Sequence, residues 1–174
     1  MSVDTSAGTN GAKLARADRL ALLVVALYIV LGAIYGVVSP IMENPDEVYH
    51  YPLVKHLADG NALPVQQKGV PAAWEQEGSQ PPLYYVAMAA LTAWINTDDL
   101  AELRYFNPHA RIGIPMATDN KNMLMHDSHE RWPWHGATLA IHVVRTASVL
   151  LGAGTVWCAY GLARRLFAQR IEVA

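Results

Sequence analysis

Three apolar stretches stand out in a chain whose other segments mix polar and apolar residues. Residues 20–38 (LALLVVALYIVLGAIYGVV) contain no charged side chain, and residues 146–163 (TASVLLGAGTVWCAYGLA) are also uncharged. A helix rises about 1.5 Å per residue, so about 20 residues cross a hydrocarbon core of roughly 30 Å. With Val143 and Val144 added to the second stretch, the pattern predicts two membrane-spanning helices, at 20–38 and 143–163.

The third stretch, residues 82–95 (PLYYVAMAALTAWI), is shorter. Apolar runs of this length are typical of buried, re-entrant or interfacial segments. Tyr84, Tyr85 and Trp94 stand near its two ends, and aromatic rings favour the headgroup region of a bilayer. We therefore expect a helix near 82–96 at the outer membrane surface. A third membrane span is the alternative that the pattern leaves open.

A further helix is expected near residues 47–59. Apolar residues recur every three to four positions between 48 and 58 and give one apolar stripe, which favours a helix resting on the membrane surface. Asp46 is suited to cap the N-terminus of this helix, and Gly60 is typical of a helix end. Pro52 conflicts with an uninterrupted helix, so we expect either a kink there or a later start.

The distribution of charge predicts the orientation in the membrane. Residues 39–136 hold twelve acidic residues against six basic ones. Basic residues flank the two predicted spans on their other sides, namely Lys13, Arg16, Arg19, Arg164, Arg165 and Arg170. Because basic flanks stay in the cytoplasm, we expect a cytoplasmic tail at 1–19, an extracytoplasmic loop at 39–140 and a second cytoplasmic end at 164–174. Both ends on one side require an even number of spans.

Overall composition conceals this membrane character. The hydrophobic fraction of 52% and the mean hydropathy of +0.13 would also fit a soluble protein. The first apolar stretch is longer than the core of a secretory signal, and Ser39 and Pro40 follow it where a cleavage site would have small residues, so we expect an uncleaved anchor. No glycine-rich phosphate loop and no basic patch occur in the sequence, which argues against nucleic-acid or nucleotide partners.

Asp46 and Glu47 are the first candidates for chemistry. A carboxylate placed just beyond a membrane span, at the start of a surface helix, can act as a general base toward a hydroxyl. His50 follows one turn later on the same helix face. The structural alternative is a capping residue followed by an acid that complements the helix dipole.

Two other features have a structural and a functional interpretation. Residues 79–85 (SQPPLYY) form either a rigid turn before an anchored helix or the wall of a lipid-headgroup pocket. Arg145, at the outer end of the second predicted span, either reaches toward the interface or binds a phosphate with its fork of donors. The spacing of four loop histidines matches no metal signature, so no metal site is predicted at His109, His126, His129 or His135.

Taken in order, these segments resemble a known group of enzymes. After the basic tail and first span come ENPDEVYHYPLVKHLADGNALPV, then SQPPLYYVAMAAL, then VVRTASVLLGAGTVWCAYGLARRLF. This order is similar to that in the N-terminal part of bacterial glycosyltransferase family 39 proteins. These belong to the GT-C membrane glycosyltransferases, together with protein O-mannosyltransferases and the aminoarabinose transferase of lipid A. The resemblance covers residues 15–168 and implies an all-α integral membrane fold with two membrane helices and a long extracytoplasmic first loop.

The resemblance implies inverting transfer of a sugar from a polyprenyl-phosphate-linked donor to a hydroxyl of a protein, glycan or lipid acceptor. It implies that Asp46 is the catalytic base, with Glu47 as its neighbour or substitute. Residues expected to contact the substrate are His50, Gln80, Tyr84, Tyr85 and Arg145. One departure is Gln80, because aminoarabinose transferases have at that position a lysine that meets the lipid phosphate. No cofactor is implied with certainty, since some members use a divalent metal and others do not.

Two spans cannot build the dozen-span bundle of that family. We therefore expect the sequence to be an N-terminal piece of a larger protein of the bacterial inner membrane, inactive without the rest. The alternative is a non-catalytic two-span scaffold or binding subunit whose acidic residues only cap a helix.

Overall fold

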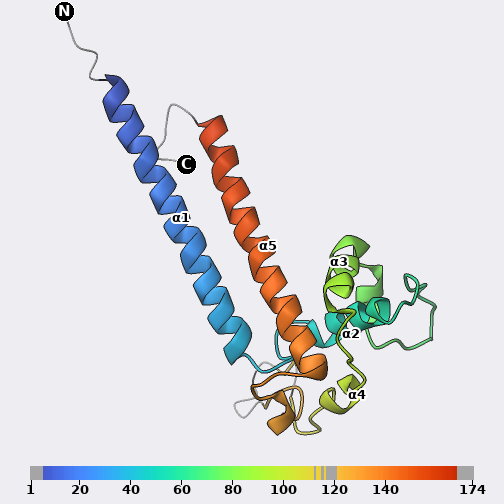
Figure 1. Ribbon diagram of the computed structural model, residues 1–174. Coiled ribbons are helices and arrows are strands. Elements are labelled where there is room, and N and C mark those ends of the chain that lie inside the picture. Colours follow the sequence, from blue (N-terminus) through green and yellow to red (C-terminus); the bar gives the residue numbers. More distant parts are fainter. Residues whose placement is uncertain (1–5, 112, 115, 117–120, 168–174) are drawn as a thin grey trace, which may run out of the picture. The chain divides into compact units, whose positions relative to one another are not determined.

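The computed structural model describes residues 6–111, 113, 114, 116 and 121–167, and the expected chain ends at 1–19 and 164–174 lie partly outside this range. The structure is helical, and within the described residues it contains no strand, only an isolated bridge between Phe106 and Leu124. The helices are α1 (Ser6–Val38), α2 (Glu47–Ala58), α3 (Pro82–Thr92), α4 (Leu100–Leu103) and α5 (Gly136–Leu166), with the 3₁₀ helices η1 (Glu75–Ser79) and η2 (Ser128–Glu130) (Figure 1). The predicted all-α fold is thus confirmed.

The chain divides into two compact units. The first contains residues up to Tyr35 together with those from Thr146 onward, and the second contains Gly36–Arg145. Most of α1 and α5 belongs to the first unit, whereas α2, α3, α4 and the loops belong to the second. Each unit is described by itself below.

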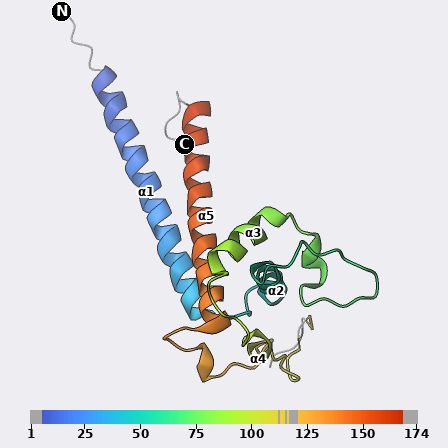
Figure 2. The same ribbon diagram turned by 45° about the vertical axis from the view of Figure 1, so that its right-hand side comes forward.

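In the first unit, α1 and α5 lie side by side and antiparallel (Figures 1 and 2). Asp18, in the first half of α1, accepts hydrogen bonds from Tyr160 Oη at 2.7 Å and Arg164 Nη1 at 2.6 Å, near the end of α5. Further along, a Cβ added at Gly32 would come within 2.9 Å of Val149. A glycine at this position therefore permits the close approach of the two helices.

Two helices are long and apolar enough to cross a membrane. Their candidate spans are Ala15–Val38, with mean hydropathy 2.6, and Gly136–Leu166, with mean hydropathy 1.5. The second helix begins at Gly136, seven residues before the predicted span at 143–163. The carboxylate of Asp99 accepts a hydrogen bond from Ala137 N at 2.9 Å. This bond caps the N-terminus of the helix and so stabilises the additional residues.

In the second unit, α2 packs against α3. The helix α2 is continuous through Pro52, so the later start is not observed. Proline lacks an N–H, so the carbonyl of Val48, four residues earlier, loses its helical partner. Arg104 Nε donates to that carbonyl at 3.2 Å and replaces the missing bond. Its guanidinium also lies 6.0 Å from the ring centroid of Tyr49, which adds a weak cation–π contact.

The helix α3 is two-faced. Tyr85, Met88, Ala89 and Thr92 are buried on one side. Leu83 is 80% exposed, and Val86, Leu91 and Trp94 are also exposed. Its 11 residues rise about 16 Å, roughly half the thickness of a hydrocarbon core. By length α3 is therefore not a candidate span.

Candidate functional site

Asp46 stands immediately before α2 with an exposed side chain. Its backbone adopts the left-handed conformation with φ 59°, and its carboxylate makes no capping hydrogen bond. The backbone carbonyl of Asp46 instead accepts from Tyr49 N at 2.9 Å and His50 N at 2.8 Å. The helix therefore starts where the sequence predicts, but the side-chain cap expected of Asp46 is absent.

Glu47, the next residue, has the opposite environment. Its carboxylate oxygens lie 2.7 Å from Nε and 2.6 Å from Nη2 of Arg145, a bidentate pair in which the two side chains are only 15% and 8% exposed. Met42 N also donates to Glu47 Oε2 at 2.7 Å. Of two adjacent carboxylates, Glu47 is thus fixed inside the unit, whereas Asp46 lies at its surface.

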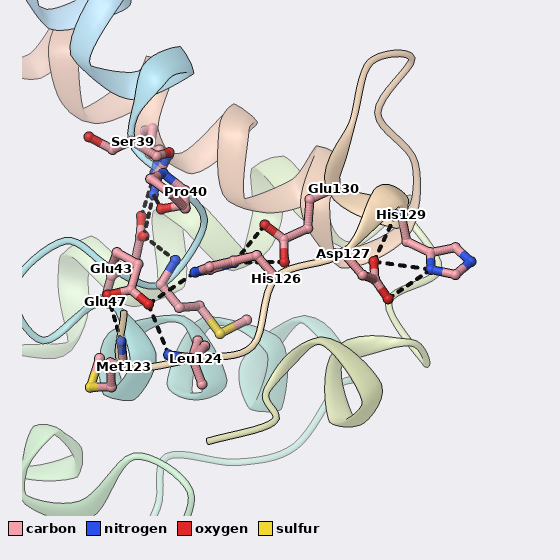
Figure 3. Close-up of polar contacts among 12 residues, drawn as sticks. Ser39, Pro40, Glu43, Glu47, Met123, Leu124, His126, Asp127, His129 and Glu130 are labelled. Atoms are coloured by element: carbon pink, nitrogen blue, oxygen red, sulfur yellow. Dashed lines mark hydrogen bonds and ion pairs between the residues drawn. The ribbon is translucent and has the colours of Figure 1, made fainter. Parts of the chain in front are cut away.

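The guanidinium of Arg145 is saturated by acceptors. An arginine carries five N–H donors, and besides the two bonds to Glu47 the donors reach three backbone carbonyls at the end of α1 and in the turn after it. These are Gly36 O at 2.7 Å, Ser39 O at 2.8 Å and Pro40 O at 2.9 Å; Figure 3 shows Ser39, Pro40 and Glu47 converging. Arg145 therefore ties together the end of α1, the following turn and the start of α2. To bind a phosphate as well, it would have to give up one of these bonds.

His50 is the centre of a second polar group, on the face of α2 that meets α3. Its Nδ1 lies 2.7 Å from the hydroxyl of Tyr85 and 3.4 Å from Oε2 of Glu77. Glu77 is only 3% exposed, so its carboxylate is held inside the unit close to the imidazole of His50. Burial, followed by the negative charge of Glu77, raises the pKa of Tyr85 to about 12. Tyr85 therefore stays protonated and can donate at neutral pH.

A cavity of about 190 Å³ adjoins this group. Its wall is mainly apolar, and Gln80 and Tyr85 are its polar members; the other lining residues are Leu53, Leu57, Leu63, Pro64, Gly78 and Pro82. Tyr84 does not line it but contacts Tyr85 edge-on, with ring centroids 5.5 Å apart. The structure thus brings together Gln80 and Tyr85 around one cavity, with His50 hydrogen-bonded to Tyr85, and places Arg145 in the separate cluster with Glu47.

Sequence patterns did not reveal Glu77, Arg104 or Glu43. Glu77 lies in a stretch expected to be a loop, and an isolated glutamate there gives no periodic signal of burial. Glu43 receives hydrogen bonds from a segment 80 residues away, at Met123 N and Leu124 N. Within the described parts of the chain, no group of three or more His, Cys, Asp or Glu side chains is arranged to hold a metal ion.

Comparison with known proteins gives no relative for this chain: no family model, no curated protein and no solved structure matches it.

Proposed function

We propose that this chain carries the acceptor-activating loop of a GT-C type membrane glycosyltransferase. In this proposal a sugar passes from a polyprenyl-phosphate-linked donor to an acceptor hydroxyl on the extracytoplasmic side. One observation supports it most: of the adjacent carboxylates that follow a candidate span, Asp46 is exposed without a capping bond while Glu47 is held by Arg145. General-base catalysis needs an accessible carboxylate that is held in place by a rigid backbone, and Asp46 fits this description.

The proposed reaction assigns one chemical step to Asp46. Its carboxylate takes the proton of the acceptor hydroxyl as that oxygen attacks the anomeric carbon of the sugar. The new carbon–oxygen bond forms on one face, and the bond to the lipid phosphate breaks on the other. The configuration is therefore inverted, and the phosphate leaves as an anion that needs no proton.

Glu47 and Arg145 receive a positioning role in this proposal. Breaking a buried ion pair by removing one partner costs about 3–5 kcal/mol, so the pair fixes the turn from which Asp46 projects. Arg145, with its donors engaged by Glu47 and three carbonyls, is assigned to this task in place of phosphate binding. Gln80 and Tyr85 are proposed to contact the substrate from the cavity beside α3, and His50 and Tyr84, which both contact Tyr85, are proposed to contact it from beside that cavity.

The membrane arrangement is part of the proposal. The antiparallel pairing of α1 and α5 is consistent with two spans whose basic ends share the cytoplasmic side. The loop with Asp46 and α2 then faces the outer side, where α3 rests at the lipid surface. Membrane lipid, the lipid-linked donor and an acceptor hydroxyl are the proposed partners.

The test compares Asp46→Asn with Asp59→Asn, an exposed acid at the other end of α2. Membranes containing the protein, expressed from its complete reading frame, are assayed for transfer of labelled mannose from polyprenyl-phosphate mannose, with the corresponding glucose donor in parallel. We expect Asp46→Asn to lower transfer at least about a hundredfold, the usual scale of a general base, and Asp59→Asn to leave it unchanged. Transfer retained by Asp46→Asn would remove this residue from the mechanism. Absence of transfer in the wild-type protein would favour the scaffold alternative.

A further inference from the structure

His126 lies between two carboxylates that come from different parts of the second unit. Its Nε2 is 3.0 Å from Glu43 Oε1, and its Nδ1 is 2.8 Å from both carboxylate oxygens of Glu130 (Figure 3). All three side chains are less than 20% exposed. Glu43 precedes α2, whereas His126 and Glu130 belong to the segment that leads into α5.

The backbone completes this contact. The two carboxylate oxygens of Glu43 also accept from Met123 N at 3.0 Å and Leu124 N at 2.9 Å. The side chain of Leu124 is also buried, at 1% exposure, so this residue is held both by its amide and by packing. Glu43 therefore holds three donors from one short segment, and a single side chain fastens residues 123–130 to the turn before α2.

The hydrogen bonds need one more proton than a neutral imidazole supplies. A neutral histidine has one N–H donor and one lone pair, and only the imidazolium donates from both nitrogens. Here both nitrogens lie within 3.0 Å of carboxylate oxygens, which accept but do not donate when ionised. In a neutral ring one lone pair would face a carboxylate at this distance. The geometry is therefore satisfied by an imidazolium between two anions.

Two further charged groups, Asp127 and His129, stand beside His126 in the chain. Asp127 is the next residue in the chain; it pairs at the surface with His129, whose Nδ1 lies 3.1 Å from Asp127 Oδ2, and that pair is largely exposed. The negative charge of Asp127 favours the imidazolium, and the positive charge of a protonated His129 opposes it, but solvent screens both more than it screens Glu43 and Glu130. Glu43 and Glu130, which are less than 20% exposed, therefore act on the imidazole more strongly than the exposed pair does.

We propose that Glu43, His126 and Glu130 form a protonated clasp that positions the turn carrying Asp46, and that breaking this clasp releases residues 123–130 from this turn. Glu43 is three residues before Asp46, with Pro45 between them to limit the freedom of the backbone. The role given to the clasp rests on the proposed function in one respect, because Asp46 is taken to be the group that the clasp positions. His126 is a positioning residue here, not a catalytic one.

The protonation of His126 can be measured without any transfer reaction. The full chain, with ¹⁵N-labelled histidine, is placed in lipid nanodiscs, and long-range ¹H–¹⁵N correlation reports which ring nitrogens carry a proton. His126 is assigned by the signal lost in His126→Gln. At neutral pH we expect both ring nitrogens of His126 to be protonated. In Glu130→Gln, which removes one anion but keeps the size of the side chain, we expect one of them to be deprotonated. A single neutral tautomer in the wild-type chain would overturn the proposal.

Hydrogen exchange tests the release. We expect the amides of Met123 and Leu124 to exchange at least about tenfold faster in His126→Gln than in the wild-type chain, since they lose a neighbour that holds their acceptor. The matched control is His129→Gln, a histidine of the same segment whose side chain is 73% exposed, and it should leave both rates unchanged. Equal rates in all three proteins would contradict the clasp. Glu130→Gln serves as the second variant if His126→Gln fails to fold.

Transfer kinetics separate positioning from a purely structural role. Because the clasp positions Asp46 and does not touch the substrate, Glu130→Gln should lower kcat with little change in KM. An unchanged kcat would refute the link to Asp46. Failure of the proposed function would appear differently, as transfer that persists in Asp46→Asn or is absent from the wild-type protein.

Discussion

The carboxylate of Glu47 is bound by the guanidinium of Arg145 through two parallel hydrogen bonds of 2.7 and 2.6 Å. The two residues are 98 positions apart in the chain, yet both are nearly buried. Removing two charges from water is costly, and such a pair is favourable only when its remaining donors and acceptors are also satisfied. Three backbone carbonyls and one backbone N–H meet this requirement here.

This geometry predicts unequal roles for two arginines of α5. Arg145→Ala leaves Glu47 buried without its partner, so we expect a loss of about 3–5 kcal/mol in the stability of the second unit. Arg164 is also ion-paired, with Asp18 at 2.6 Å, but these side chains are 38% and 39% exposed. Arg164→Ala should therefore cost less than about 1 kcal/mol. Thermal unfolding of both variants in one detergent measures the difference, and similar midpoints would contradict the special role of Arg145.

Arg104 and Pro52 predict a coupling that a double-mutant cycle can detect. Arg104→Met removes the donor that reaches the Val48 carbonyl, so we expect it to destabilise α2 by about 1 kcal/mol or more. Pro52→Ala restores a backbone N–H at the position that normally bonds to that carbonyl. In the Pro52→Ala background, Arg104→Met should therefore cost less. Additive losses in the denaturant unfolding of the four proteins would show that the arginine does not replace the missing helical bond.

Periodicity and charge in the sequence predict the helices but not the contacts between distant side chains. The apolar run at 20–38 and the stripe of α2 follow from local spacing, because each helix must bury or expose one continuous face. The helical residues of α5 before position 143 could not be predicted, since the capping residue, Asp99, lies 38 residues from the amide that it binds. The burial of Glu77 and the saturation of Arg145 likewise depend on which segments contact each other in the tertiary structure. A local sequence pattern does not predict such contacts.

The same limit applies to the candidate site. Asp46 and Glu47 look equivalent in the sequence as two acids at a helix start. Only the tertiary structure distinguishes them, because an arginine from the beginning of α5 reaches one and not the other. The spacing of the loop histidines does not distinguish His126 from the others, and its two carboxylate partners come from 83 residues before it and four residues after it.

The raised pKa of Tyr85 predicts loss of stability in alkali. The pKa of Tyr85 is about 12 in the folded protein against an ordinary value of 10.0, so the stabilising effect is complete below pH 10 and is lost as the pH rises through 12. Each pKa unit corresponds to about 1.4 kcal/mol, which limits the loss to about 3 kcal/mol. Burial raises the pKa of Tyr51 as well, so a loss of the same sign adds to it.

Tyr85→Phe removes the ionisable group and should reduce the loss of stability between pH 10 and pH 12. Tyr105→Phe, at a side chain that is 63% exposed, is the matched control and should leave that loss unchanged. Thermal midpoints of the three proteins across this pH range, followed together with tyrosinate absorbance, measure the effect. Equal losses in Tyr85→Phe and the wild-type protein would show that another group controls the alkaline transition.

The proposed placement of α3 at the lipid surface predicts which segments on its two sides a reagent can reach from outside. Cys158, the single cysteine, is first replaced by serine, and new cysteines are introduced one at a time at Ala73 and Ser128, both of which are exposed. If α3 lies at the interface, a membrane-impermeant thiol reagent added outside should label both positions in intact cells. Because 11 residues rise only about 16 Å, crossing the bilayer would leave part of its core unspanned.

A cysteine at Ala15, at the start of the first candidate span, supplies the matched control for sidedness. With cytoplasmic ends, it should react only after the membrane is permeabilised. Labelling of Ala73→Cys with protection of Ser128→Cys would mean that α3 crosses the membrane, and the second unit could not then lie on one side. Labelling of Ala15→Cys in intact cells, with protection of the other two, would invert the orientation and place Asp46 on the cytoplasmic side, away from a donor that is used outside. The three positions together therefore decide whether the proposed base faces the compartment in which it would work.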